Sequence, residues 1–267
     1  MISCVEYVNK RKQILKERIE RFKEQPCLVV IQVGDDPASS VYVKNKKKLS
    51  EELGIKFEHT KLEKDISEID LIRTIDFYNR KCDVDGIIVQ LPLPEHLDAK
   101  RITETIAVDK DVDGFRHDSL LKPCTPKGII NWLIYNKINL ADKTVCVIGR
   151  SDIVGKPLVD LLIKEDATVV WCHSKTKFIR KHSLNADIVI SAIGKPNYFD
   201  ERFFNPNQII VDVGINRDIY GRLCGDVCES VSKFVEYKTP VPNGVGKLTV
   251  LSLMENVVEA HLLSGGV

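Results

Sequence analysis

The sequence has almost no net charge and no long apolar run. Its 39 basic and 38 acidic side chains leave a formal net charge of +1, so neither nucleic acid nor an anionic membrane surface is indicated as a partner. No apolar segment approaches the ~20 residues that a membrane-spanning helix needs. We therefore predict a cytoplasmic protein that binds neither nucleic acid nor membrane.

The sequence also lacks the cysteine spacing of a metal or redox site. None of its eight cysteines forms a Cys-x-x-Cys pair, and most lie in apolar runs, where a thiol behaves as a small hydrophobic group. Cys224 and Cys228 have no second pair and no spaced histidines to complete a zinc site. We predict no metal, and thiols kept reduced.

The sequence does contain two successive α/β units. In the first, strands that are apolar on both faces alternate with helices, which predicts a parallel sheet covered by helices. Its predicted elements are a helix over 5–24, a strand over 27–33, a helix from 39 to 54, a strand over 56–62, a helix over 68–79, a strand over 86–90 and a helix over 99–106.

The helix that begins near residue 39 carries a lysine on its apolar side. Because each helical residue turns by about 100°, Lys46 falls on the same side as Tyr42, Leu49 and Leu53. Two interpretations stay open. The stem of Lys46 packs while its ammonium reaches solvent, or the side chain is desolvated at the wall of a cleft and exchanges protons near neutral pH.

The carboxyl ends of the predicted strands would meet at one edge, where open α/β sheets bind ligands. This edge would contain the turn before the Lys46 helix and the turn at Gln90. It would also contain the segment with Asp111 and Asp113, if the chain returns there. A lysine, a glutamine and two aspartates could thus converge on one cleft. Loop capping is the competing interpretation for the two aspartates.

A second unit follows residue 126 and is of the dinucleotide-binding kind. A strand over 144–148 runs into a turn with Gly149, Arg150, Ser151 and Gly155, and then into a helix whose free N–H groups attract a phosphate. The glycines are spaced more widely than in Gly-x-Gly-x-x-Gly, but the strand before and the helix after support the interpretation. Further strands are predicted over 168–172, 187–194 and 209–214, followed by a long C-terminal helix.

The end of the strand over 168–172 indicates which dinucleotide binds. NAD sites place a carboxylate there to bond the ribose 2′-hydroxyl. This chain has Ser174 and Lys175 instead, and with Arg150 nearby they would suit a 2′-phosphate. NADP is therefore the predicted cofactor, and His173 is interpreted as structural.

Ordered motifs along nearly the whole chain carry a family resemblance. They are Val33-Gly34-Asp35-Asp36-Pro37-Ala38-Ser39, Tyr42-Val43-x-x-Lys46-x-Lys48, Gln90-Leu91-Pro92-Leu93-Pro94, Lys110-Asp111-Val112-Asp113-Gly114-Phe115, Pro123-Cys124-Thr125-Pro126, Gly149-Arg150-Ser151-x-Ile153-Val154-Gly155-x-Pro157, Val213-Gly214-Ile215-Asn216, Gly225-Asp226-Val227 and Thr239-Pro240-Val241-Pro242. Together they resemble the bifunctional methylenetetrahydrofolate dehydrogenase/methenyltetrahydrofolate cyclohydrolase family.

The resemblance implies NADP-dependent oxidation of 5,10-methylenetetrahydrofolate to the methenyl form, and hydrolysis of that form to 10-formyltetrahydrofolate. By position it implies Lys46 as the essential residue of the hydrolysis, with Gln90 as its hydrogen-bond partner. It implies that Tyr42 stacks on the aminobenzoate ring and that Asp113 accepts the pterin N–H groups. The implied NADP contacts are Gly149, Arg150, Ser151, Gly155, Ser174 and Ile215.

We therefore predict two parallel-sheet α/β domains with a cleft between them. The catalytic, folate-binding domain is predicted over residues 1–123, completed by the helix 247–267, and a Rossmann-type NADP-binding domain over 124–246. The resemblance also implies a homodimer formed through the dinucleotide domain.

Two segments depart from the family's pattern. The usual ending Pro-Gly-Gly-Val-Gly-Pro-Met-Thr is replaced by Pro-Asn-Gly-Val-Gly-Lys-Leu-Thr over 242–249. Asn243 tolerates positive φ, and Lys247 adds a cation that we expect to shift affinity rather than abolish activity. Residues 116–122 replace a longer segment that usually begins His-Pro, which leaves recognition of the folate tail open.

Two other functions remain as alternatives. One is a dehydrogenase that has lost the cyclohydrolase activity, against which the presence of Lys46, Tyr42 and Gln90 argues. The other is a non-catalytic regulator that binds a dinucleotide.

Overall fold

β1 (Cys27–Val33), buried along its whole length, is the central strand of a three-stranded sheet of order β2-β1-β3. It pairs in parallel with β2 (Lys56–Leu62) on one side and with β3 (Gly86–Val89) on the other. The parallel sheet predicted for the first half of the chain is therefore confirmed.

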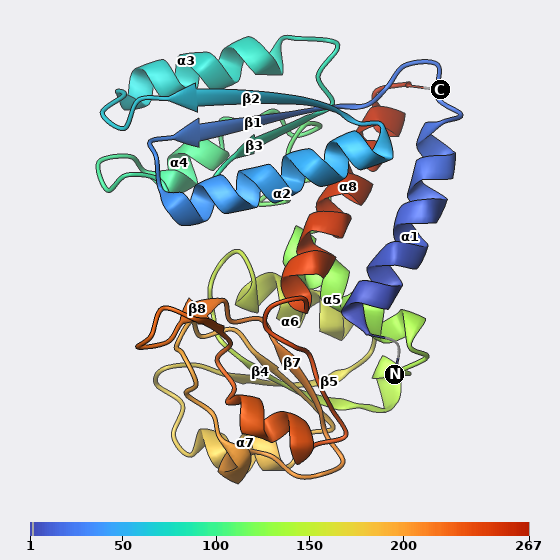
Figure 1. Ribbon diagram of the computed structural model, residues 1–267, viewed down its shortest axis with the longest axis vertical. Coiled ribbons are helices and arrows are strands. Elements are labelled where there is room, and N and C mark those ends of the chain that lie inside the picture. The colour runs from blue at the N-terminus through green and yellow to red at the C-terminus, as the bar shows by residue number, and fades with distance from the viewer. Residues whose placement is uncertain (2, 267) are drawn as a thin grey trace. The chain divides into compact units, whose positions relative to one another are not determined.

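The computed structural model describes residue 1 and residues 3–266. The chain divides into two units (Figure 1), one made of residues 10–124 and 250–267 and the other of residues 1–9 and 125–249. Ile2 and Val267, at the ends of the predicted catalytic domain, lie outside the described residues.

In the unit built on β1, helices cover both faces of the sheet. Ile31 belongs to a buried cluster with Leu71 of α3, whereas the neighbouring Gln32 donates a hydrogen bond to the Ser40 hydroxyl of α2 at 3.2 Å. Since successive residues of a strand face opposite ways, α2 and α3 lie on opposite faces (Figure 1). The helices of this unit are most of α1 (Cys4–Ile19), α2 (Pro37–Leu53), α3 (Glu68–Asn79), α4 (Ala99–Thr103) and the later part of α8 (Val245–Leu263).

Some predicted elements differ from the observed ones. α1 ends at Ile19 rather than at 24, because Pro26 disfavours a helix before it and the chain must turn into β1. The helix predicted over 99–106 ends at Thr103, and the Arg116 guanidinium donates to the Ile106 carbonyl at 2.8 Å. β2 is not apolar on both faces, because it is an edge strand with mostly half-buried or exposed residues. The strands predicted over 86–90, 187–194 and 209–214 are shorter in the structure, where they are β3, β6 (Ile188–Ser191) and β7 (Ile209–Asp212).

The second unit contains a five-stranded parallel sheet of order β10-β7-β6-β4-β5. Cys146, Val189 and Ile210 come from three neighbouring strands and share one buried cluster. This is the Rossmann-type arrangement that the sequence predicts. Its elements are α5 (Cys124–Tyr135), η1 (Leu140–Asp142), β4 (Thr144–Ile148), α6 (Gly155–Lys164), β5 (Thr168–Cys172), α7 (Ile179–Leu184), β6 (Ile188–Ser191), η2 (Glu201–Phe203), β7 (Ile209–Asp212), the antiparallel pair β8 (Asn216–Arg217) and β9 (Leu223–Cys224), η3 (Glu229–Lys233), β10 (Tyr237–Lys238) and the start of α8.

Among the described residues, every helix is too short or too polar to cross a lipid bilayer.

Candidate functional sites in the two units

α2 turns Lys46 toward the interior of its unit. The helix begins at the cap Asp36, which accepts the Ser39 N–H at 2.7 Å, and ends at Gly54 with φ of +84°. Lys46 is only 8% exposed, whereas the other lysines of the helix are exposed: Lys44, Lys47 and Lys48. Of the two interpretations of Lys46, this burial fits the desolvated side chain rather than an ammonium extended into solvent.

Gln90 is the hydrogen-bond partner of Lys46. The Lys46 Nζ donates to the Gln90 Oε1 at 3.0 Å, and both side chains are buried. The Gln90 Nε2 donates in turn to the Leu91 carbonyl at 2.6 Å. Because an ammonium can only donate, the contact requires the amide oxygen to face Lys46. Gln90 thus orients the Nζ without placing a negative charge beside it.

The two aspartates near this edge have different surroundings. The chain at Asp111 runs parallel to β3, as expected if it returns to the sheet. The Asp111 carboxylate accepts the N–H groups of Gly114 at 3.1 Å and Arg116 at 2.9 Å, so loop capping accounts for it. Burial raises the pKa of Asp113, and the positive charge of Lys46 opposes that rise. Asp113 is therefore within electrostatic reach of Lys46.

Tyr42 lies one helical turn before Lys46, on the same side of α2. Its side chain is half-buried, and burial raises the pKa of the phenol. The ring is therefore uncharged at neutral pH and offers a flat, partly apolar surface beside Lys46. The structure thus brings together Tyr42, Lys46, Gln90 and Asp113 within one unit.

In the other unit, the turn after β4 leaves no room for side chains at its two glycines. Gly149 has φ of +139°, and a Cβ there would lie 2.3 Å from the Ala192 carbonyl oxygen. A Cβ at Gly155 would lie 2.5 Å from the Gly149 carbonyl oxygen. The Ser151 hydroxyl accepts the Gly155 N–H at 3.3 Å. The start of α6 therefore comes close to the end of β4, which fits the binding of a dinucleotide phosphate.

Arg150 and Ser174 meet beside this turn. The Arg150 Nη2 donates to the Ser174 hydroxyl at 3.3 Å, and both residues are exposed at the ends of the neighbouring strands β4 and β5. A guanidinium and a hydroxyl at this place fit a 2′-phosphate. The His173 Nδ1 accepts the Lys175 N–H at 3.1 Å, a contact that supports the turn.

The loop after β7 carries Ile215, which is 47% exposed. Two buried carboxylates hold this loop, Asp212 and Asp226, and neither was predicted from the sequence as a functional residue. The sequence feature that could have indicated them is an aspartate close to a glycine at the end of a strand, Asp212 before Gly214 and Asp226 after Gly225. This feature is not specific, because turns commonly contain both residue types.

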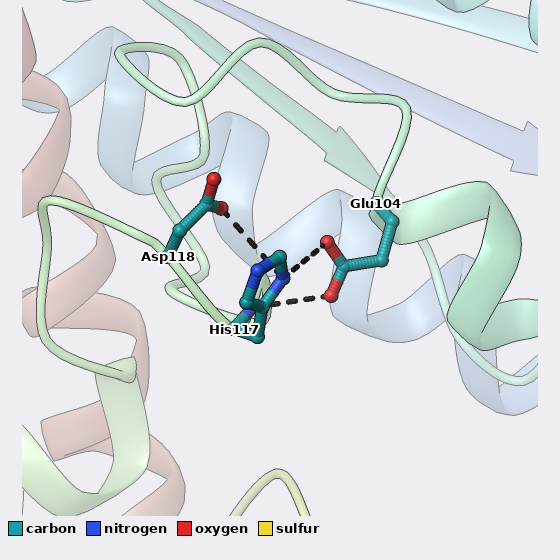
Figure 2. A group of neighbouring side chains, drawn as sticks. All are labelled: Glu104, His117 and Asp118. Carbon is teal, nitrogen blue, oxygen red and sulfur yellow. Dashed lines mark hydrogen bonds and ion pairs between the residues drawn. The ribbon is translucent and has the colours of Figure 1, made fainter.

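A cluster outside both sites contains side chains of the metal-binding kind. Figure 2 shows Glu104, His117 and Asp118 facing one another. The His117 Nδ1 pairs with Glu104 at 2.9 Å, and the Arg116 guanidinium donates to Asp118 at 2.8 Å. The hydrogen bond from Arg116 lowers the pKa of Asp118. Burial would raise the pKa of Glu104, but hydrogen bonds from His117 outweigh that effect, so the pKa of Glu104 is lowered too. These contacts tie down the loop over 116–122, and the absence of a bound metal stays a prediction.

Two parallel α/β units, one with a buried lysine–glutamine pair and one with a glycine turn of the dinucleotide kind, define a class of nucleotide-dependent α/β enzymes. The model of the tetrahydrofolate dehydrogenase/cyclohydrolase catalytic domain matches residues 2–113, and that of the NAD(P)-binding domain matches residues 123–264. The chain belongs to the tetrahydrofolate dehydrogenase/cyclohydrolase family. The predicted resemblance is therefore confirmed, as are the enzyme class and the NAD(P)-binding domain.

Named relatives cover nearly the whole chain. The bifunctional protein FolD of Bacillus velezensis is 43% identical over 265 residues, covering 94% of this chain and 93% of the relative. The crystal structure of the bifunctional FolD methylenetetrahydrofolate dehydrogenase/cyclohydrolase of Campylobacter jejuni is similar with a TM-score of 0.92 and 41% identity, covering 96% of each chain. The Trypanosoma brucei enzyme, solved with NADP and an inhibitor, has a TM-score of 0.92 and 30% identity, covering 99% of this chain and 97% of that one.

Proposed function

We propose that this chain oxidises 5,10-methylenetetrahydrofolate to 5,10-methenyltetrahydrofolate with NADP, and hydrolyses the methenyl form to 10-formyltetrahydrofolate. The observation that carries the proposal is the buried hydrogen bond of 3.0 Å between Lys46 and Gln90. We assign the folate chemistry to the predicted domain over 1–123 with 247–267, and NADP binding to the domain over 124–246.

The hydrolysis needs proton transfers that a buried amine can perform. Water adds to the methenyl carbon, the bond from that carbon to N5 breaks, N5 takes up one proton and one proton is released overall. We assign the movement of these protons to the Lys46 Nζ, held in place by Gln90. Tyr42, one turn away, is placed to stack on the aminobenzoate ring. The carboxyl of Asp113 would accept the N–H groups of the pterin edge.

The residues around the glycine turn fit NADP. Gly149 and Gly155 make room for the pyrophosphate, and Arg150 with Ser174 would hold the 2′-phosphate. Ser151 and Ile215 are the remaining proposed contacts. When bound, the nicotinamide ring supplies the hydride acceptor for the oxidation, so the chain's own task is to hold that ring against the folate.

We also propose a homodimer formed through the β8–β9 ribbon of the dinucleotide domain. The ribbon's tip carries Ile219 and Tyr220, whose side chains are 90% and 75% exposed. Large apolar side chains grouped at an exposed tip favour burial against a partner.

A cytoplasmic location is proposed from the cysteines. All eight are free thiols, and free thiols persist in reducing compartments.

A coupled assay tests the two activities, with NADP reduction reporting the oxidation and the loss of methenyl absorbance reporting the hydrolysis. In a Lys46→Met variant we expect the hydrolysis to slow by about 100-fold or more, the range that a lost acid–base group typically costs. Lys44→Met is the matched control, because Lys44 is on the same helix but exposed. A Lys46→Met enzyme that hydrolyses the methenyl substrate at the wild-type rate would refute the role of Lys46.

The same assay separates the alternatives. A dehydrogenase without cyclohydrolase activity would reduce NADP but leave the methenyl absorbance unchanged beyond its spontaneous decay. A non-catalytic regulator would bind NADP and show neither reaction.

A further inference from the structure

The carboxylate of Asp226 is wholly buried and accepts four hydrogen bonds. Its Oδ2 accepts the Ser191 hydroxyl at 2.9 Å and the Ile193 N–H at 2.8 Å. Its Oδ1 accepts the Lys195 N–H at 2.9 Å and the Asn216 side-chain amide at 2.9 Å. A buried carboxylate is tolerated only when donors of this kind satisfy it. Asp226 therefore fixes the groups that donate to it.

These donors lie at the ligand-binding edge of the sheet: Ser191 ends β6, Ile193 and Lys195 are on the loop after it, and Asn216 begins β8 directly after the loop that follows β7. Residues 192–195 follow β6, and residues 213–216 follow β7. β4 has β5 on one side and β6 on the other, so the strand order reverses at β4, and ligands bind at such a point. The loop after β6 also abuts the glycine turn, since a Cβ on Gly149 would lie 2.3 Å from the Ala192 carbonyl.

Asp226 is itself held in one position. Asp212 accepts the backbone N–H groups of Asp226 at 2.9 Å and Val227 at 3.0 Å. Glycines leave space for both carboxylates: a Cβ on Gly214 would lie 2.3 Å from the Asp226 Oδ1, and one on Gly225 would lie 1.8 Å from the Asp212 Oδ2. The two aspartates thus lock together the segment around 226 and the two loops.

We propose that Asp226 is a positioning residue for the nicotinamide half of NADP. The inference rests on the proposed function. Arg150 and Ser174, at the ends of β4 and β5, are assigned to the 2′-phosphate, so the rest of the dinucleotide extends toward the ends of β6 and β7. Asp226 acts there by holding the loop over 192–195 and the loop that presents Ile215.

The experiment measures the dissociation constants of NADP and of the fragment 2′,5′-ADP with the full-length Asp226→Asn protein. The asparagine places an NH2 group against N–H donors, so hydrogen bonds to a charged group are lost and the loops are held less firmly. We therefore expect the dissociation constant of NADP to rise by about tenfold or more. Binding of 2′,5′-ADP, which reports on Arg150 and Ser174, is expected within about twofold of wild type. The cyclohydrolase rate, which needs no dinucleotide, is expected to be unchanged.

Asp218→Asn is the matched control, because the Asp218 carboxylate also accepts backbone N–H groups, from Tyr220 and Arg222, but none from residues 192–195. If Asp226→Asn does not fold, the Asn216→Ala variant tests the proposal instead, because it removes one hydrogen-bond donor to Asp226. We expect it to weaken the binding of NADP more than the binding of 2′,5′-ADP. Unchanged NADP binding in the folded variant, or equal weakening of NADP and 2′,5′-ADP, overturns the proposal. Wild-type protein that does not bind NADP refutes the proposed function instead.

Discussion

The buried carboxyl of Asp212 makes the stability of its unit depend on pH in an unusual direction. Burial raises the pKa of Asp212 from 3.8 to about 6, although the N–H groups of Val227 and Asp226 oppose the rise. A carboxyl with a raised pKa binds its proton more tightly in the folded state than in the unfolded state. Its contribution to stability is therefore complete below about pH 3.8 and is lost as the pH rises through about 6.

The size of the effect follows from the shift. About two pKa units at about 1.4 kcal/mol each give about 3 kcal/mol over the whole range. Between about pH 5 and about pH 7.5, a group titrating near 6 in the folded state accounts for about 1.4 kcal/mol of this. An Asp212→Asn variant lacks the titration. We expect the free energy of unfolding of wild type, relative to the variant, to fall by about that amount across the window.

Urea unfolding followed by tryptophan fluorescence measures this difference. Both tryptophans of the chain, Trp132 and Trp171, belong to the same unit as Asp212, so the signal reports on that unit. The control is Asp218→Asn. Burial would raise the pKa of Asp218, but hydrogen bonds, chiefly from Arg222, outweigh it and lower the pKa. The difference in the free energy of unfolding between wild type and Asp218→Asn should therefore stay constant across this pH window. A level difference for Asp212→Asn, or one that grows with pH, would refute the reasoning.

Two further predictions concern the site. Gly149→Ala would place a Cβ 2.3 Å from the Ala192 carbonyl, so we expect the KM for NADP to rise about tenfold or more while hydrolysis persists. The control is Gly221→Ala, because Gly221 also has a positive φ but a Cβ there would meet nothing within 4 Å. It should leave the KM for NADP and the hydrolysis rate unchanged. Lys247 is exposed in the first turn of α8, and its backbone N–H donates to the Gly244 carbonyl at 3.0 Å, so proline there removes this one hydrogen bond together with the cation. Lys247→Pro should therefore change the Michaelis constants and retain kcat, and constants close to wild type would rule out a role for this cation.

The sequence predicted the site residues better where one helix carries them than where separate loops do. The spacing of Tyr42 and Lys46 placed both on the buried side of α2, because helical periodicity is local. The fit of Asn243, at a position where the family usually has glycine, was also predictable from the sequence. Its φ is +74°, a conformation that asparagine tolerates. By contrast, Asp111 and Asp113 could not be told apart, because their difference arises from the backbone N–H groups and the lysine charge that the fold brings near each.

By itself, the sequence determined the two α/β units and the parallel order of their strands, because apolar strands, glycine turns and helix caps are read from neighbouring residues. Its ordered motifs carried the family resemblance. The resemblance implied Gln90, 44 positions away, as the partner of Lys46, but only the tertiary structure decided that the Lys46 side chain is buried against this neutral amide oxygen rather than extended into water. Only it showed that Asp226 accepts hydrogen bonds from residues as far away as Ser191, 35 positions earlier. The physical reason is the same in both cases. The protonation and orientation of a buried polar group depend on which distant partners replace its lost water, and that choice is made when the sheet assembles.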